Sequence, residues 1–222
     1  TQLAEGDLFV STSGFGAYII GDNDVLTTTI DYTPEVDEPF YDEVYEDSKG
    51  RFWRSSLIAN AVILKANKGF AKFESTVAGP IAFIERGDEV FVIGIKGIMV
   101  FRNGQMQDAD IDTSVLKGKD VLFNTATTDS EGNIYIGTRG NGLFRIPLGE
   151  RRLERVSVNV LGVNLNTATL TDIMFDQKGD MWLGLERKGL MLVTQQPSLF
   201  TSWSFERQHI QLGSCITSIC EG

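Results

Sequence analysis

The sequence predicts an all-β fold, a β-propeller built from four-stranded blades, and three observations lead to this prediction. A unit of tight turn, apolar strand, second turn and second apolar strand recurs five times along the 222 residues. The turn anchors Gly6, Gly50, Glu89, Gly132 and Gly179 are spaced by 44, 39, 43 and 47 residues. Each copy consists of short runs that alternate between apolar and polar residues. Such copies at a period of about 40–45 residues are typical of propeller blades and not of helical solenoids.

The copies can be followed in order along the chain. They are AEGDLFVSTSGFGAYII (4–20), EDSKGRFWRSSLIANAVIL (46–64), RGDEVFVIGIKGIMVF (86–101), DSEGNIYIGTRGNGLFRI (129–146) and FDQKGDMWLGLERKGLMLV (175–193). The third copy diverges most, because Glu89 takes the turn position and its second loop is two residues shorter. LIANAVILKANKGF (57–70) has the alanine and lysine content of a helix, but its place in the repeat predicts strand.

The best-defined copy predicts strands at about 171–176, 180–185, 189–195 and 199–206. The chain is then one propeller domain or a fragment of one. Its blades are expected at roughly 1–43, 44–80, 81–120, 121–166 and 167–212, with 213–222 starting or closing another blade. Five copies leave two arrangements open, a closed five-bladed ring and part of a seven-bladed ring.

Two residue types recur at fixed places in these copies. An aromatic residue on the second strand (Phe9, Trp53, Tyr135 or Trp182) is expected to wedge between neighbouring blades. An aspartate three residues before the turn glycine (Asp47, Asp129 or Asp176) is expected to be structural. Its carboxylate can accept hydrogen bonds from turn amides two or three residues further on, as in an Asx-turn.

The combination D-x-x-G-x-x-W-x-G, followed by a Gly-Leu pair, resembles the two-component regulator propeller repeat. It stands here as Asp47–Gly50–Trp53, as Asp129–Gly132–Tyr135–Gly137 and as Asp176–Gly179–Trp182–Gly184, with Gly142–Leu143 and Gly189–Leu190 following. The resemblance implies the periplasmic sensor domain of a hybrid two-component histidine kinase of the Bacteroidetes type, which senses oligosaccharides. It implies seven-bladed rings as the usual form, and histidine kinase activity in other parts of the parent protein.

Charge excludes one class of partner. The chain carries 30 acidic and 20 basic residues, for a net charge of −10. Nucleic acid is therefore a poor partner, since phosphate contacts need a basic face. The excess lies in DYTPEVDEPFYDEVYED (31–47), where Tyr32 and Tyr41 are candidates for stacking on a sugar. A solvated loop is the alternative there, and a calcium site is a further one, although the run lacks D-x-D-x-D-G spacing.

The loops between the second and third strands supply the other candidate ligand-binding residues. These are Arg139, Asn141, Glu186, Arg187 and Lys188, polar groups suited to sugar hydroxyls, uronates or sulfates. An arginine can hold an acidic sugar through two parallel hydrogen bonds. Solvated loop charges are the alternative interpretation.

The resulting functional prediction is a non-catalytic, extracytoplasmic binding module without cofactor or metal. The single histidine, His209, has no evident catalytic partner. Expected partners are an oligosaccharide or neighbouring domains of the same sensor, with a homodimer left open and membrane contact only through other parts of the parent protein. The alternatives are a propeller-fold polysaccharide lyase or glycosidase, and a protein-interaction scaffold.

Overall fold

The fold is all-β throughout the part of the chain described by the computed structural model, residues 8–11, 17–21, 26–29, 43–56, 61–66, 69–160, 163–194 and 201–203. The chain divides into two compact units, Thr1–Ala109 and Asp110–Gly222, which are described separately below. The helices among the described residues are two 3-10 turns, η1 (Ser114–Leu116) and η2 (Leu165–Thr167). None of the described helices has the length and apolar character needed to cross a membrane.

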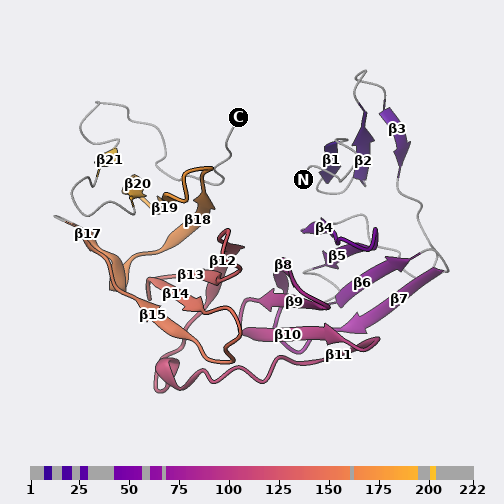
Figure 1. The fold of residues 1–222 in the computed structure, drawn as a ribbon, viewed down its shortest axis with the longest axis horizontal. Coiled ribbons are helices and arrows are strands. Elements are labelled where there is room, and N and C mark those ends of the chain that lie inside the picture. The colour runs from indigo at the N-terminus through magenta and orange to yellow at the C-terminus, as the bar shows by residue number, and fades with distance from the viewer. Residues whose placement is uncertain are drawn as a thin grey trace. The chain divides into compact units, whose positions relative to one another are not determined.

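The first unit contains three antiparallel sheets in which strands adjacent in sequence are adjacent in space (Figure 1). One sheet has β1 (Leu8–Ser11), β2 (Ala17–Ile20) and β3 (Leu26–Thr29). The second has β4 (Val44–Glu46), β5 (Phe52–Ser56), β6 (Ala61–Ala66) and β7 (Gly69–Glu74). The third has β8 (Pro80–Arg86), β9 (Glu89–Gly94), β10 (Gly97–Arg102) and β11 (Gln105–Asp108).

The second unit repeats this four-stranded pattern twice. One sheet has β12 (Phe123–Thr128), β13 (Ile134–Thr138), β14 (Leu143–Ile146) and β15 (Glu154–Val156). The other has β18 (Leu170–Phe175), β19 (Met181–Leu185), β20 (Gly189–Val193) and β21 (Thr201–Trp203). A short hairpin of β16 (Asn159–Val160) and β17 (Val163–Asn164) lies between them in sequence.

These sheets confirm the predicted fold of four-stranded antiparallel blades. The four strands predicted for the fifth copy are present. The predicted choice of strand over helix is also confirmed for β6 and for the start of β7, while residues 57–60 lie outside the described part. Residues 213–222 and the side chain of Phe9 lie outside it as well.

In the first unit, the repeated aromatic residue joins two neighbouring sheets as predicted. Trp53 on β5 is fully buried and packs against Phe83 of β8 and Phe101 of β10, with ring centroids 6.2 Å and 4.9 Å away. The surrounding core includes Val62, Val90 and other apolar residues from both sheets. Side chains that fill both faces of the strands explain why β9 reads as an apolar run over most of its length.

In the second unit, the equivalent contact is made by Tyr135 on β13. Its ring lies 4.9 Å from that of Phe175 on β18. Close approach of these sheets also depends on Gly137, since a Cβ atom there would stand 2.7 Å from Thr125 Cγ2 and 2.8 Å from Leu170 Cβ. The recurring glycine two residues after the aromatic thus leaves room for the neighbouring sheet.

The third copy differs from its prediction at the turn. Glu89 is not in the turn but is the first residue of β9, where it pairs with Arg86. The connection is a two-residue hairpin of Gly87 and Asp88, three residues shorter than the 47–51 turn. Gly87 has a φ of +61°, which a two-residue hairpin requires and which glycine adopts without strain. Because the copies were aligned as if this turn had the same length in each, the predicted anchor was Glu89, two residues after the turn glycine Gly87.

Replacing Trp53 by alanine is expected to destabilise the chain by about 3–5 kcal/mol, because a large cavity would open between two sheets. Trp53→Phe, which keeps a ring in the cavity, is expected to cost less. Urea denaturation followed by circular dichroism measures both changes. The matched control is Leu148→Ala, since Leu148 is 55% exposed; equal stability of wild type and Trp53→Ala would contradict this account of the packing.

Candidate functional site

Each sheet has two chemically different ends. At the turn end, a hairpin joins the first strand to the second (47–51, 87–88, 129–133 and 176–180). At the loop end, the described connections between the second and third strands (95–96, 139–142 and 186–188) contact the segment that leads into the first strand. The amides of Ile95, Arg139 and Glu186 donate to the carbonyls of Gly79, Leu122 and Thr169, at 3.1, 2.9 and 3.0 Å. These three residues therefore hold equivalent positions in three sheets.

The turn end is organised by the repeated aspartate, which is structural as predicted. Asp47 Oδ1 accepts hydrogen bonds from the amides of Lys49 and Arg51, at 3.0 and 2.9 Å. Its Oδ2 accepts one from Trp53 Nε1 at 2.7 Å and one from Arg51 Nε at 2.6 Å. The prediction of an acceptor for the amide two residues on is confirmed, but the second amide is four residues on and not three. The amide three residues on, that of Gly50, donates to the Asp47 backbone carbonyl.

The same pattern recurs in the second unit. Asp129 and Asp176 each accept hydrogen bonds from the amides two and four residues further on. Asp176 Oδ2 accepts from Trp182 Nε1 at 3.0 Å, whereas Asp129 Oδ2 accepts from Asn133 Nδ2 at 2.8 Å. All three carboxylates thus accept hydrogen bonds from the turn that they hold.

These hydrogen bonds change the acidity of two turn carboxyls. Burial by itself raises the pKa of Asp47, but hydrogen bonds from Trp53 and Arg51 outweigh it, and the pKa lies below its ordinary value of 3.8. The hydrogen bond from Trp182 likewise lowers the pKa of Asp176. Both carboxylates are therefore stabilised in the charged form.

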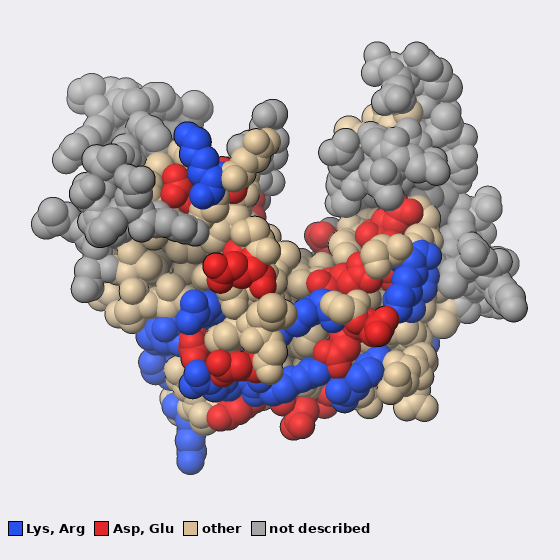
Figure 2. Space-filling model, viewed as in Figure 1, with Lys and Arg blue, Asp and Glu red and all other residues tan. Residues whose placement is uncertain are grey.

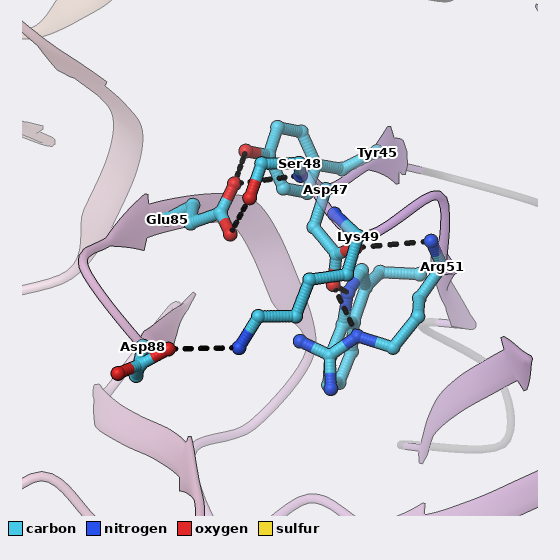
Figure 3. Close-up of polar contacts among 8 residues, drawn as sticks. Tyr45, Asp47, Ser48, Lys49, Arg51, Glu85 and Asp88 are labelled. Carbon is cyan, nitrogen blue, oxygen red and sulfur yellow. Dashed lines mark hydrogen bonds and ion pairs between the residues drawn. The ribbon is translucent and has the colours of Figure 1, made fainter.

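The neighbouring sheet contacts the turn at Asp47 through hydrogen bonds to Glu85 of β8, as Figure 3 shows. Glu85 Oε2 accepts hydrogen bonds from Ser48 N at 2.8 Å and from Tyr45 OH at 3.3 Å, and Oε1 accepts one from Ser48 Oγ at 2.7 Å. Burial, with the Glu85 carboxylate beside the hydroxyl, raises the pKa of Tyr45 to about 12. Lys49 also pairs with Asp88 at 2.9 Å, but both side chains are exposed and the pair adds little. This cluster joins two blades and holds no open coordination position.

At the loop end of the second unit lie the predicted residues of two equivalent loops. Arg139 is exposed and Asn141 half-buried; Asn141 N donates to Thr138 Oγ1 at 3.1 Å, and Arg155 Nη1 donates to the Asn141 carbonyl at 2.7 Å. Glu186, Arg187 and Lys188 are all exposed, and Arg187 has a φ of +59°.

Within the described contacts, no hydrogen bond or ion pair joins the side chains of residues 139 and 141 to those of 186–188. Tyr32 and Tyr41 lie outside the described residues.

Sequence reasoning missed Asn124, which contacts the candidate residue Arg139. Asn124 is the extra residue of a β-bulge in β12, between the pairs Phe123–Thr138 and Thr125–Gly137. Asn124 Oδ1 accepts from Arg139 Nε at 2.8 Å, and its Nδ2 donates to the Leu170 carbonyl of the next sheet at 2.8 Å. A bulge re-aims a side chain, but the residue pattern alone does not reveal it.

Among the described residues, neither a metal-binding cluster nor, on the face drawn in Figure 2, a patch of one charge marks a site. On the face shown in Figure 2, positive and negative side chains are interleaved along the described part of the molecule. In the described ranges, no group of three or more His, Cys, Asp or Glu side chains is arranged to hold a metal ion.

Comparison of the fold with solved structures identifies it as a β-propeller. PorZ, a surface component of the type-IX secretion system of Porphyromonas gingivalis, matches with a TM-score of 0.70 at 16% identity, over 97% of this chain and 35% of that one. The extracellular domain of BT3049 from B. thetaiotaomicron, described as a hybrid two-component system, matches with a TM-score of 0.67 at 20% identity, over 91% and 27%. Virginiamycin B lyase from Staphylococcus aureus matches with a TM-score of 0.66 at 14% identity, over 92% and 68%.

The chain thus spans about a third or less of the length of the first two of these proteins. No protein-family model matches it, and a search of curated proteins finds no match. At these identities the comparisons establish the fold.

The turn carboxylates generate a prediction about pH. A carboxyl whose pKa is depressed on folding stabilises the native state above its unfolded pKa, near 3.8, and this contribution is lost as the pH falls through the lower folded pKa. Asp47→Asn is therefore expected to lower the free energy of unfolding at pH 7 by about 1–3 kcal/mol, because Nδ2 cannot accept from Trp53. The variant is expected to approach wild type as the pH falls below about 4.

Urea denaturation of both proteins between neutral and acidic pH measures this convergence. Trp53→Phe is the matched control, because it removes the indole donor and leaves the carboxylate and the turn amides. If the free energies of unfolding of wild type and Asp47→Asn differed by the same amount at every pH, the charge on Asp47 would not contribute to stability.

Proposed function

We propose that the chain is part of the extracytoplasmic sensor of a hybrid two-component system and that it is a binding module for an oligosaccharide or a neighbouring domain. The observation that carries the proposal is the loop end of the second unit, where exposed polar side chains stand on loops fixed by backbone hydrogen bonds. The likeness to the extracellular domain of BT3049 supports the sensor context and a periplasmic location.

The proposed binding residues are Arg139, Asn141, Glu186, Arg187 and Lys188. Their backbones are held by the contacts of the two loops, so the loops need not be ordered when a ligand binds. Pre-positioned groups lose less conformational entropy on binding. Tyr32 and Tyr41 stay candidates from the sequence.

We propose no catalysis for this chain. Its turn carboxylates already accept two or more hydrogen bonds each, which supports a structural use of these acids. Signal transfer would then come from altered contacts between the propeller and neighbouring domains, with the histidine kinase in other parts of the parent protein. A homodimer fits the same proposal.

An enzyme is the second candidate, because the fold is shared with virginiamycin B lyase. A polysaccharide lyase or glycosidase would need an acid–base pair facing its substrate. A pure interaction scaffold is the third candidate.

Calorimetry of the chain against a panel of plant and host oligosaccharides is expected to show binding to at least one member. The double variant Arg187→Ala/Lys188→Ala is expected to bind that sugar about tenfold or more weakly, since hydrogen bonds to charged groups contribute about 1.5–3 kcal/mol. The matched control, Arg151→Ala/Arg152→Ala, removes the same charge between β14 and β15 at the turn end and is expected to bind as wild type does.

Two results would count against the proposal. Absence of heat with every sugar would overturn oligosaccharide binding and leave docking of a neighbouring domain, as in the scaffold. More product than protein after incubation with a polysaccharide would establish turnover and favour the enzyme.

A further inference from the structure

Arg139 differs from four other described arginines in what its side chain contacts. Several described arginines pair with a carboxylate: Arg51, Arg102, Arg145 and Arg152. The side chain of Arg139 instead makes one recorded hydrogen bond, from Nε to the neutral amide oxygen of Asn124. Among the described residues, no carboxylate forms an ion pair with Arg139, and its Nη1 and Nη2 atoms have no protein acceptor.

Asn124 is held in the orientation that this contact needs. Its Nδ2 donates to the Leu170 carbonyl, which can only accept, and its Oδ1 faces the Arg139 guanidinium, which can only donate. The two contacts fix the amide without ambiguity. Since Leu170 begins the first strand of the next sheet, Asn124 is tied to two sheets at once.

Among the described ion pairs, none joins Arg139 to Asp172, an acid on the first strand of the next sheet. Asp172 Oδ1 accepts from the Ile173 amide at 2.9 Å and from Thr125 Oγ1 at 3.4 Å. A guanidinium with a fixed Nε and two unengaged Nη atoms presents a planar pair of donors, which matches the two oxygens of a carboxylate or sulfate.

The equivalent positions in two other described sheets carry different residues. Ile95 occupies the position of Arg139 in the third sheet, and Glu186 occupies it in the fifth. The bulged residue equivalent to Asn124 is Ile81 in the third sheet and Thr171 in the fifth. The fold therefore does not require Arg and Asn here.

We propose that Arg139 binds the carboxylate or sulfate of an acidic oligosaccharide and that Asn124 is its positioning residue. This rests on the proposed function and narrows its ligand to a sugar with an anionic group. The Nη atoms of Arg139 donate to the anion, while Asn124 holds Nε and sets the plane of the guanidinium.

The test compares matched acidic and neutral probes on the full 222-residue chain. One pair is a galacturonate oligosaccharide and its methyl ester, and the other is a sulfated galactan oligosaccharide and its desulfated form. At least one acidic probe is expected to bind about 10- to 100-fold more tightly than its neutral counterpart. The pair that shows the difference identifies the carboxylate or the sulfate as the anion.

Arg139→Ala is expected to abolish this preference. Arg139→Lys is expected to retain only part of it, because lysine keeps the charge but lacks the planar pair of N–H donors of a guanidinium. Arg152→Ala, which removes a paired arginine of the same unit, is the control and is expected to leave the preference unchanged. Thermal melting of each variant establishes that it is folded.

Asn124→Ala separates positioning from general support. It removes the amide oxygen that holds Arg139 Nε and adds no charge, so the preference for the acidic probe is expected to fall although Arg139 keeps its positive charge. A merely structural role would lower the melting temperature and leave the ratio of the two affinities unchanged.

Equal binding of acidic and neutral probes, or an Arg139→Ala variant with unchanged preference, would overturn this inference while leaving the proposed function intact. Failure of every sugar to bind would overturn this inference together with the oligosaccharide form of the proposed function. Arg139-dependent binding of a polyglutamate peptide, with no acidic sugar bound, would assign the site to a protein partner and overturn the glycan assignment.

Discussion

The structure depends on a hydrogen bond between a turn carboxylate and the indole of the next strand. A buried indole N–H needs an acceptor, or its desolvation would offset part of the gain from burying the ring. In the first unit the acceptor is Asp47 Oδ2, 2.7 Å from Trp53 Nε1, and the same carboxylate holds the turn through its other oxygen. Turn geometry and ring orientation are thus set by one side chain. The ring can then fill the space between two sheets with its own N–H satisfied.

The copies without this arrangement reveal what it supplies. The fourth copy has Tyr135, and there the carboxylate of Asp129 bonds the side chain of Asn133 in place of an indole. The third copy lacks the five-residue turn and its leading aspartate; the one aspartate of its two-residue hairpin, Asp88, pairs with Lys49 of the preceding blade. The first strand of the third copy instead carries Glu85, which accepts three hydrogen bonds from the preceding blade. The join between the second and third sheets is therefore closed by the preceding blade's own turn together with an acid from the following one.

Much of this could be predicted from the sequence, because strands, turns and their aromatic residues follow local periodicity. The strand assignment, the inter-sheet position of Trp53 and the structural use of Asp47 all come from spacing within one copy. The contacts of Glu85 could not be predicted, since its partner Ser48 lies 37 residues away. The contacts of Asn124 could not be predicted for a different reason. A bulge inserts one residue into a strand and moves the following side chains to the other face, and only the pairing with the neighbouring strand reveals where this happens.

The two ends of each sheet therefore carry different constraints. At the turn end, a change at the aspartate affects several hydrogen bonds and the packing of a neighbouring sheet at once. At the loop end, the backbone contact is made by an amide that every residue except proline possesses. Ile95, Arg139 and Glu186 make it equally well, although their side chains are apolar, cationic and anionic. Since the side chain is free to vary there while the loop keeps its position, recognition chemistry can change from blade to blade without cost to the fold. That freedom makes the unpaired charge of Arg139 informative about a ligand and not about folding.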